Sequence, residues 1–383
     1  MGDVRVLPIT TAEDRLKLIH FPWKVYRNDP YWVPPLLSER KAFIDPEKSP
    51  FFEHARVQFF LAERDGEIVG TIAAFTNDLY NKFQGTNVGW FGFFEVLEDR
   101  AAAKALLEAA TAWARAAGHT TLLGPAQFST NDEVGLLVDG FDDPPRILMT
   151  YNPRYYIDFI EAAGFRKAQD LLAYTTNLER MRAAGGVPPK LLRVVAKLQE
   201  RGRLTVRSVR MKEFRAEVEK VKEIYNRSWA RNWGFVPMTD PEIDRLADQL
   251  KPLVDPDLIA VVEVDGRTVG FGLTLPDLNG PLRRAYPRPG VPEWWTLVKF
   301  FWHWKVRKQV PWMRAFALGV MPEYRGKGVD ALMYLHTLNV ALRKGYRAVE
   351  MSWLLESNEM VLRSAELLGG ERYKTYRVYE KSL

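Results

Sequence analysis

The chain has 383 residues, of which 47% are hydrophobic and 27% charged, and its net charge is +6. This much apolar side chain excludes an intrinsically disordered protein, and the length predicts two or three domains. Cysteine is absent, which excludes disulfides, thiolate catalysis and thiolate metal sites. Without a signal-like segment or an uncharged apolar run of ~20 residues, we expect a cytoplasmic protein with no transmembrane segment.

An internal repeat organises the chain. Residues 59–75 and 258–275 each read as an apolar strand, an Asp-Gly turn and a second apolar strand, the pattern of a β-hairpin. Each hairpin is followed by a strand, a helix that stops at a glycine (Gly118 or Gly345), another strand and a further helix. The repeat predicts two domains of mixed α/β fold, at 1–181 and 204–383. A basic linker at 182–203 joins them.

Two insertions distinguish the copies. The first copy is longer around residues 128–145, where the polar cluster 129–133 is either a solvated loop or a substrate-recognition loop. The second copy is longer at 281–308, which is rich in Trp and basic residues. We expect 294–304 to form a helix packed over the second domain, walling an acceptor cleft. Contact with a membrane surface is the less favoured alternative, because ordinary monomers do not expose so many aromatic side chains.

The segment 317–333 carries the clearest chemical motif. A strand ends at a proline and is followed by Arg325-Gly326-Lys327-Gly328 and then a helix. Backbone N–H groups at a helix N-terminus bind phosphate oxygens, and glycines let the anion approach closely. The order of proline, arginine, glycines and helix favours anion binding over a plain tight turn with solvated basic residues.

This motif resembles the acyl-CoA pyrophosphate loop of GNAT-superfamily N-acyltransferases, Arg/Gln-x-x-Gly-x-Gly/Ala. Arg325 and Gly328 match it, whereas Asp330 replaces a small residue. The resemblance covers 204–383 and implies two GNAT-like domains in tandem, each a twisted mixed sheet flanked by helices. The first copy has lost the loop, since it reads Leu-Glu-Asp-Arg at 97–100. The cofactor-binding residues implied by the resemblance are Leu318, Gly319, Val320, Arg325, Gly326, Lys327, Gly328, Val329, Asp330 and Asn358.

The resemblance also directs the search for catalytic groups. A tyrosine on the last helix of the family commonly protonates the thiolate, but the corresponding position here is Ala365. Tyr373 or Tyr376 on the following strand could replace it, or could pack on the sheet. Glu350 and Glu356 are the candidate bases, with surface or capping roles as the alternative. The five histidines show no metal-ligand spacing, so we expect no metal.

These features predict a transferase, an acyl-CoA-dependent N-acyltransferase that most simply uses acetyl-CoA and acts on a small-molecule or peptide amine. One alternative is a non-catalytic ligand-binding or regulatory tandem GNAT protein. A second is a transferase of the Fem type that uses aminoacyl-tRNA; nucleic acid is otherwise not an expected partner. The acceptor, the acyl chain length and the oligomeric state stay open.

Overall fold

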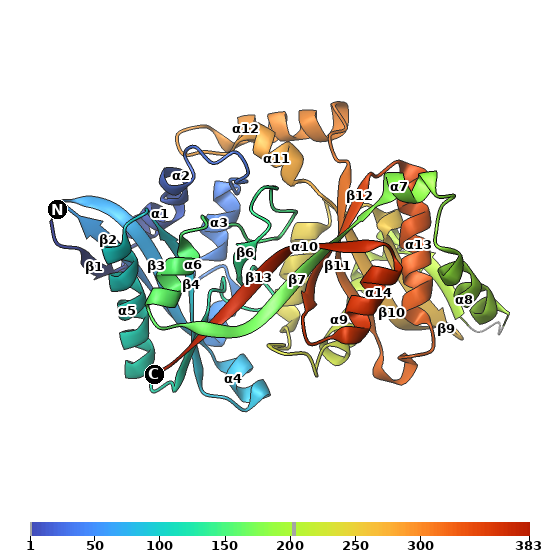
Figure 1. Cartoon of the computed structure of the whole chain (residues 1–383), viewed down its shortest axis with the longest axis horizontal. Coiled ribbons are helices and arrows are strands. Elements are labelled where there is room, and N and C mark those ends of the chain that lie inside the picture. The colour runs from blue at the N-terminus through green and yellow to red at the C-terminus, as the bar shows by residue number, and fades with distance from the viewer. Residues whose placement is uncertain (1, 201–203) are drawn as a thin grey trace. The chain divides into compact units, whose positions relative to one another are not determined.

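The computed structural model describes residues 2–200 and 204–383, and the chain forms two compact units (Figure 1). The first unit contains residues up to 171, 281–307 and 374–383. The second unit contains 172–280 and 308–373. This division differs from the expected consecutive domains, because the Trp-rich insertion and the last ten residues belong with the first unit.

The first unit is built on a mixed sheet with strand order β1-β2-β3-β4-β5-β13, and β6 also pairs with β13. Its strands are β1 (Arg5–Pro8), β2 (Ala55–Arg64), β3 (Glu67–Asn77), β4 (Val88–Val96), β5 (Thr121–Gly124) and β6 (Leu136–Asp139). Two strands, β7 (Arg166–Asn177) and β13 (Gly370–Ser382), contribute residues to both units. Its helices are α1 (Ala12–His20), α2 (Pro22–Val25), α3 (Leu37–Phe43), η1 (Pro50–Glu53), α4 (Asp78–Gln84), α5 (Arg100–Ala116), α6 (Tyr156–Ala162), α12 (Glu293–Phe301) and η4 (Trp302–Val306).

The second unit repeats the arrangement, with strand order β7-β12-β11-β10-β9-β8. Its own strands are β8 (Leu204–Ser208), β9 (Ile259–Val264), β10 (Arg267–Pro276), β11 (Trp312–Val320) and β12 (Ala348–Leu355). The helices are α7 (Leu178–Ala183), α8 (Pro189–Gln199), η2 (Met211–Glu213), α9 (Phe214–Ser228), α10 (Asp240–Leu250), η3 (Pro256–Leu258), η5 (Pro322–Tyr324), α13 (Val329–Lys344) and α14 (Glu359–Leu367). Helix α11 (Asn279–Ala285) lies at the boundary of the two sets of residues.

The two predicted hairpins are confirmed. Asp65 and Gly66 have φ of 51° and 80°, and Asp265 and Gly266 have 49° and 80°. Two successive left-handed residues make the tight turn whose twist matches that of paired strands, and Asp-Gly suits both positions. The turns join β2 to β3 and β9 to β10 in antiparallel register.

The strand after each hairpin pairs with a parallel neighbour only over its first residues. In the first unit, 88–90 of β4 pair with 121–123 of β5. In the second unit, 312–315 of β11 pair with 348–351 of β12. The later residues of β4 and β11 therefore make no backbone pairing with β5 and β12, respectively. The candidate sites described below lie at or after these unpaired ends of β4 and β11.

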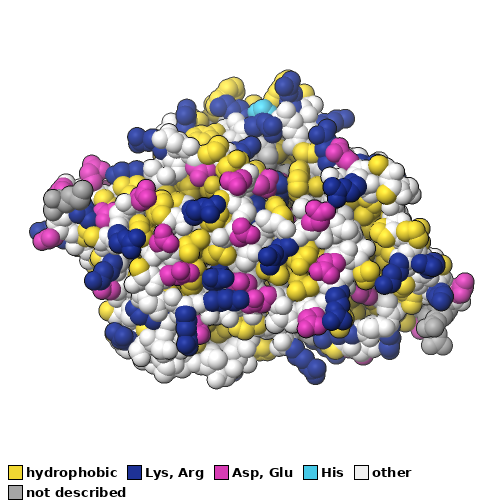
Figure 2. Space-filling model, in the orientation of Figure 1, with side chains coloured by type: hydrophobic (Ala, Val, Ile, Leu, Met, Phe, Trp, Pro, Cys, Tyr) yellow, Lys and Arg dark blue, Asp and Glu magenta, His cyan; other side chains and the backbone are white. Residues whose placement is uncertain are grey.

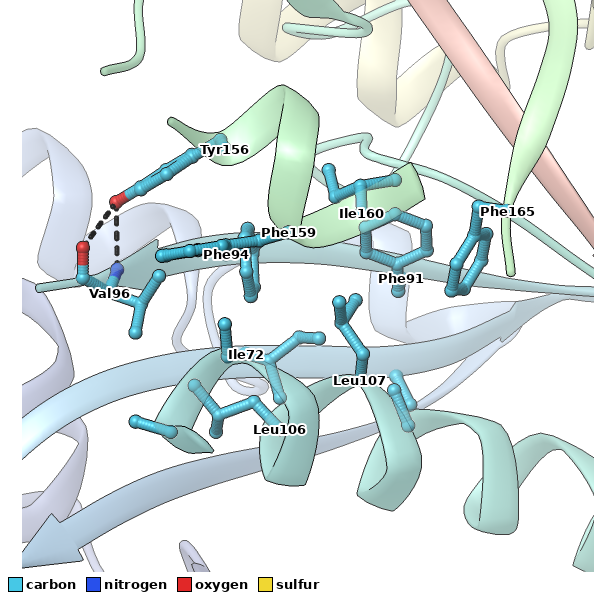
Figure 3. Close-up of a cluster of buried hydrophobic side chains, with 14 of the residues drawn as sticks. Ile72, Phe91, Phe94, Val96, Leu106, Leu107, Tyr156, Phe159, Ile160 and Phe165 are labelled. Atoms are coloured by element: carbon cyan, nitrogen blue, oxygen red, sulfur yellow. Dashed lines mark hydrogen bonds between the residues drawn. The ribbon is translucent and has the colours of Figure 1, made fainter. Parts of the chain in front are cut away.

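Each sheet is covered by a helix with a buried apolar face. In the first unit, α5 supplies Leu106 and Leu107, and α6 supplies Phe159 and Ile160, to one core shared with the strands (Figure 3). In the second unit, α13 packs on β9 and β10 and ends at Gly345, which has a φ of 82° and was the predicted stop.

The basic linker is more structured than its composition indicates. It contains the end of α7 and all of α8, and Val195 of α8 is buried against the core under α13. Arg182 donates to the carbonyl of Tyr346 at 2.7 Å. Residues 201–203 of the linker lie outside the described residues.

The prediction for the Trp-rich insertion was right about the helix and wrong about its packing. Residues 293–301 form α12, but the segment belongs to the first unit rather than covering the second. Trp294 and Trp295 are 65% and 45% exposed, so they do not wall a cleft. No helix in the described part of the chain is both long and apolar enough to cross a membrane.

Candidate active site

The predicted anion-binding loop lies between η5 and α13 in the second unit. Gly326 and Gly328 both adopt left-handed backbone conformations, with φ of 68° and 81°. Gly328 is the N-cap residue of helix α13 and provides no side-chain cap. The first-turn N–H groups of α13 are therefore left for an external acceptor, as an acyl-CoA pyrophosphate site requires.

Two neighbouring contacts shape this loop. The guanidinium of Arg325 donates a hydrogen bond to the backbone carbonyl of Ser228, at the end of α9. A Cβ at Gly328 would lie 2.3 Å from Leu198 Cδ1 on α8, so only glycine allows α8 to approach this closely. Arg325 thus braces the loop, and Gly328 is required for packing as well as for its backbone conformation.

The remaining predicted cofactor residues have mixed environments. Gly319 of β11 pairs with Phe271 of β10, while its segment lies beyond the pairing with β12. Val329 is buried against the core, and Asn358 caps α14 by accepting from the N–H of Val361. Lys327 lies with its ammonium 5.1 Å from the ring centre of Tyr324. The loop residues thus keep a position suited to an anion, whereas Val329 and Asn358 already serve packing and capping. The other predicted contacts lie on the same strand and the same helix turn: Leu318 and Val320 on β11, and Asp330 on α13.

The structure brings together Glu350, a candidate base, and Tyr373, a candidate acid. Tyr373 donates to one oxygen of Glu350, and Ser352 donates to the other at 2.6 Å. Arg314 lies 3.8 Å from the same carboxylate, and both members of this ion pair are almost completely buried. These contacts fit a buried ion pair better than a base that a substrate must reach. Glu356 lies apart, between β12 and α14, and Tyr376 is a buried residue of the first unit.

A second carboxylate cluster, in the first unit, was missed by the sequence analysis. Glu95 lies near the end of β4, beyond its pairing with β5, and is half-buried. The hydroxyl of Tyr156, at the start of α6, donates to Glu95 Oε2 at 2.8 Å. The same hydroxyl accepts from the N–H of Val96 at 2.7 Å (Figure 3). Tyr156 thereby fixes the carboxylate against the strand.

The environment of Glu95 prepares it for proton transfer near neutral pH. Burial raises its pKa from 4.5 to about 7, although hydrogen bonds from Tyr156 and Tyr26 and the charge of Arg40 act in the opposite direction. Burial and the Glu95 charge raise the pKa of Tyr156 well above its usual value, which keeps this hydroxyl a donor. A carboxylate with such a pKa is suited to act as a general base.

Arg40 connects this cluster to the first insertion. Its guanidinium donates to Gln127 at 2.6 Å and to Glu133 at 2.7 Å. Residues 129–133 are thus not a freely solvated loop, since Ser129 is buried and Glu133 is paired. Phe128, just before them, has its ring within 5 Å of three other rings, those of Phe43, Phe51 and Phe93.

The helix junction of the first unit differs from the glycine loop of the second. The carboxylate of Asp99 accepts from the N–H groups of Ala101 and Ala102 at 3.1 Å and pairs with Arg64 at 2.8 Å. A side chain therefore caps the first turn of α5, whereas α13 has no side-chain cap.

Two sequence signals could have identified the missed cluster. Glu95 is an acid within the apolar run Phe93-Phe94-Glu95-Val96. Tyr155 and Tyr156 stand at the start of the last helix of the first copy, α6. The sequence analysis sought these groups only in the second copy, because that copy has the glycine loop.

Comparison with known proteins now identifies the family. The sequence model described as "Acetyltransferase (GNAT) family" matches residues 22–132. Over the full length, the chain is 37% identical to "Bacterial ceramide synthase" of Caulobacter vibrioides (strain NA1000 / CB15N), covering 100% of this chain and 98% of the relative. It is 34% identical to "Protein YghO" of Escherichia coli (strain K12), covering 97% and 93%. The chain belongs to the GNAT acetyltransferase family.

A solved structure supports the tandem arrangement. A tandem GNAT protein from the clavulanic acid biosynthesis pathway superimposes with a TM-score of 0.56, at 15% identity, over 99% of this chain and 98% of the other. The mixed α/β fold with two GNAT copies, expected from the repeat together with the GNAT resemblance, is confirmed. The GNAT family match falls on the copy that carries Glu95, although that copy lacks the glycine loop.

Proposed function

We propose that this tandem GNAT protein transfers a long acyl chain from acyl-CoA to the amine of a lipid-like amino alcohol. Membership of the GNAT family supports acyl transfer. The full-length similarity to a protein named "Bacterial ceramide synthase" supports the substrate class, because a ceramide is an amide of a fatty acid and a long-chain amino alcohol. A long acyl-CoA therefore replaces acetyl-CoA as the favoured donor, and a lipid amine replaces the unspecified acceptor.

The contact between Tyr156 and Glu95 carries this proposal. The acceptor enters as an ammonium ion and must lose a proton before its nitrogen can attack the thioester carbon. Glu95 takes that proton, since its pKa of about 7 allows it both to accept and to release one at neutral pH. The nitrogen attacks the thioester carbon, so the C–N bond forms and the C–S bond breaks, and the leaving CoA thiolate takes up the second proton that the attacking nitrogen gives up.

The loop 325–328 of the second unit is proposed separately as a pyrophosphate site, and the proton transfer at Glu95 in the first unit is not assigned to an acyl-CoA bound there. Uncapped N–H groups of α13 and the charge of Lys327 support this assignment. Among the described residues, no group of three or more His, Asp or Glu side chains could hold a metal ion.

A matrix of donors and acceptors tests the substrate class. Purified protein is incubated with acetyl-CoA or a C16 acyl-CoA, each with a long-chain amino alcohol or with a short amine such as ethanolamine, and amide products are quantified by mass spectrometry. The proposal expects product with the long donor and the long acceptor. Amide formation only from acetyl-CoA and the short amine, or from no pair at all, would contradict it.

A further inference from the structure

Helix α12 and its continuation η4 present an apolar face to solvent. Thr296 and Phe300 are buried on the side that meets the protein. The exposed side chains recur at spacings of three, four and seven residues, so they lie on one face of the helix. They are Trp294, Trp295, Val298, Phe301, Trp302 and Val306. This is the reverse of an ordinary surface helix, which buries its apolar face.

The exposure is concentrated rather than scattered. In the part of the chain that the structure describes, thirteen large hydrophobic side chains are exposed, and seven of them lie between Tyr286 and Val306. Single exposed apolar residues are normal on a soluble protein, whereas a contiguous group marks an interaction surface. We call the exposed side chains of 286–306 the Trp face.

The helix is held in this orientation by contacts on its other side. Ser38 donates from its backbone N–H and its hydroxyl to the carboxylate of Glu293. Trp23 donates its indole N–H to the carbonyl of Pro287 at 2.8 Å, and Arg283 donates to the carbonyl of Pro30 at 2.6 Å. These bonds lie within the first unit, so the outward Trp face is fixed by the fold.

Positive charge accompanies the Trp face. Glu293 is the only acidic residue of 281–307, and its carboxylate accepts a hydrogen bond from Ser38. The basic residues of the same segment include Arg284, Arg288, Lys299, Lys305 and Arg307. The ammonium of Lys305 lies 3.5 Å from the ring centre of Trp304. Figure 2 shows hydrophobic and basic side chains side by side at the top of the view, over α12.

We propose that 281–307 docks the protein on the surface of an anionic lipid bilayer. Trp and Phe side chains partition into the interface, while Lys and Arg side chains reach anionic headgroups beside them. The nine residues of α12 and the five of η4 are too few to span a bilayer, which takes ~20. The helix therefore lies in the plane of the membrane with its Trp face down.

A second copy of the chain fits this surface less well. In a symmetric dimer the same patch meets itself, so the cations around the Trp face would oppose one another. An anionic bilayer instead complements both the apolar face and the charge. The inference rests on the geometry and charge of 281–307, and it holds whether or not the proposed reaction is correct.

Co-sedimentation of the full chain with vesicles tests the proposal. The vesicles are phosphatidylcholine alone, or phosphatidylcholine with about 30% phosphatidylglycerol. We expect binding to the anionic vesicles and at least tenfold weaker binding to the neutral ones. The double variant Trp294→Ala/Trp295→Ala should lose at least tenfold in binding to anionic vesicles. Phe83→Ala, which truncates an exposed aromatic residue on α4 of the same unit, should bind as wild type.

Three results would overturn the proposal. The first is no binding of wild type to anionic vesicles, and the second is undiminished binding by the Trp double variant. The third is a wild-type dimer in sedimentation velocity without lipid that the Trp double variant dissociates, since the Trp face would then be occupied by a second copy. Because both tryptophans are exposed, thermal melts of the two variants should match wild type.

Discussion

Tyr156 donates its hydroxyl proton to Glu95 at 2.8 Å and accepts from the N–H of Val96 at 2.7 Å, so one side chain orients the carboxylate and satisfies the strand beside it. This relationship links the last helix of the first copy to its fourth strand. It places the candidate base Glu95, and the tyrosine that orients it, in the copy that lacks the glycine loop.

Tyr156→Phe should therefore affect both stability and pH dependence. The buried N–H of Val96 loses its acceptor, which costs about 1–3 kcal/mol of unfolding free energy. The bond from Tyr156 lowers the pKa of Glu95, so its removal should move the acidic limb of the kcat/KM profile to higher pH. Tyr155→Phe is the matched control, because Tyr155 donates to the carbonyl of Val96 and not to Glu95. An unchanged limb in Tyr156→Phe would contradict the assignment.

Glu95 should also make stability depend on pH in an unusual direction. Its folded pKa of about 7 lies above the ordinary value of 4.5, so the folded state binds the proton more tightly than the unfolded state. The contribution of Glu95 to the free energy of unfolding is therefore fully present at low pH and is lost as the pH rises toward and through 7. Between about pH 5 and 8, the free energy of unfolding of wild type, measured in urea, should fall relative to that of Glu95→Gln by on the order of 1–3 kcal/mol. Parallel curves for the two proteins would refute the raised pKa.

Lys327→Glu tests the anion-binding loop without disturbing its packing, which Gly328→Glu would do through Leu198. The reversed charge should weaken CoA binding at least about tenfold, or ~1.4 kcal/mol, in calorimetry. Lys104→Glu makes the same charge change on α5, where its partner is the exposed Glu108, and should leave the affinity unchanged. Equal affinities for Lys327→Glu and wild type would mean that the loop is only a turn.

Phe128 should be the most sensitive aromatic residue of the first unit. Its side chain is buried among the rings of Phe43, Phe51 and Phe93. Phe128→Ala leaves a cavity and should cost about 3–5 kcal/mol in urea unfolding. Phe83→Ala removes a 41%-exposed ring and should cost much less. A loss of unfolding free energy below ~1 kcal/mol for Phe128→Ala would show that the packing of Phe128 among these three rings does not stabilise the insertion.

The repeated fold could be predicted because its signals are local. The Asp65-Gly66 and Asp265-Gly266 turns and the stop at Gly345 each need only their own backbone conformation. The boundaries between the two units could not be predicted in the same way. Strand β13 follows the second copy in the sequence but pairs with β5 of the first, and nothing in residues 374–382 indicates that partner. The exposure of the Trp face could not be predicted for a similar reason. Helical periodicity shows that an apolar face exists, but not whether that face is buried or exposed to solvent.

The candidate site was predictable in part. The glycine loop 325–328 has a sequence pattern and occupies the expected junction before α13. Burial separates the carboxylates: Glu350 is enclosed with Arg314, whereas Glu95 is half-buried and linked to Tyr156. Both are acids in apolar strands, so their sequence contexts look alike. Only the side chains that surround each of them in the fold distinguish an ion pair from a candidate base.

The most direct test of the account compares Glu95→Gln with Glu350→Gln and with Glu98→Gln, an exposed acid just beyond β4. Amide formation from a long-chain acyl-CoA and a long-chain amino alcohol is measured in all three, beside unfolding curves that verify folding. We predict that Glu95→Gln loses at least about 100-fold in kcat while remaining folded, since general base catalysis contributes about that much. Folded Glu350→Gln and Glu98→Gln should retain the chemical step. Full activity in Glu95→Gln, with the loss in Glu350→Gln instead, would place the base in the second unit and contradict the account.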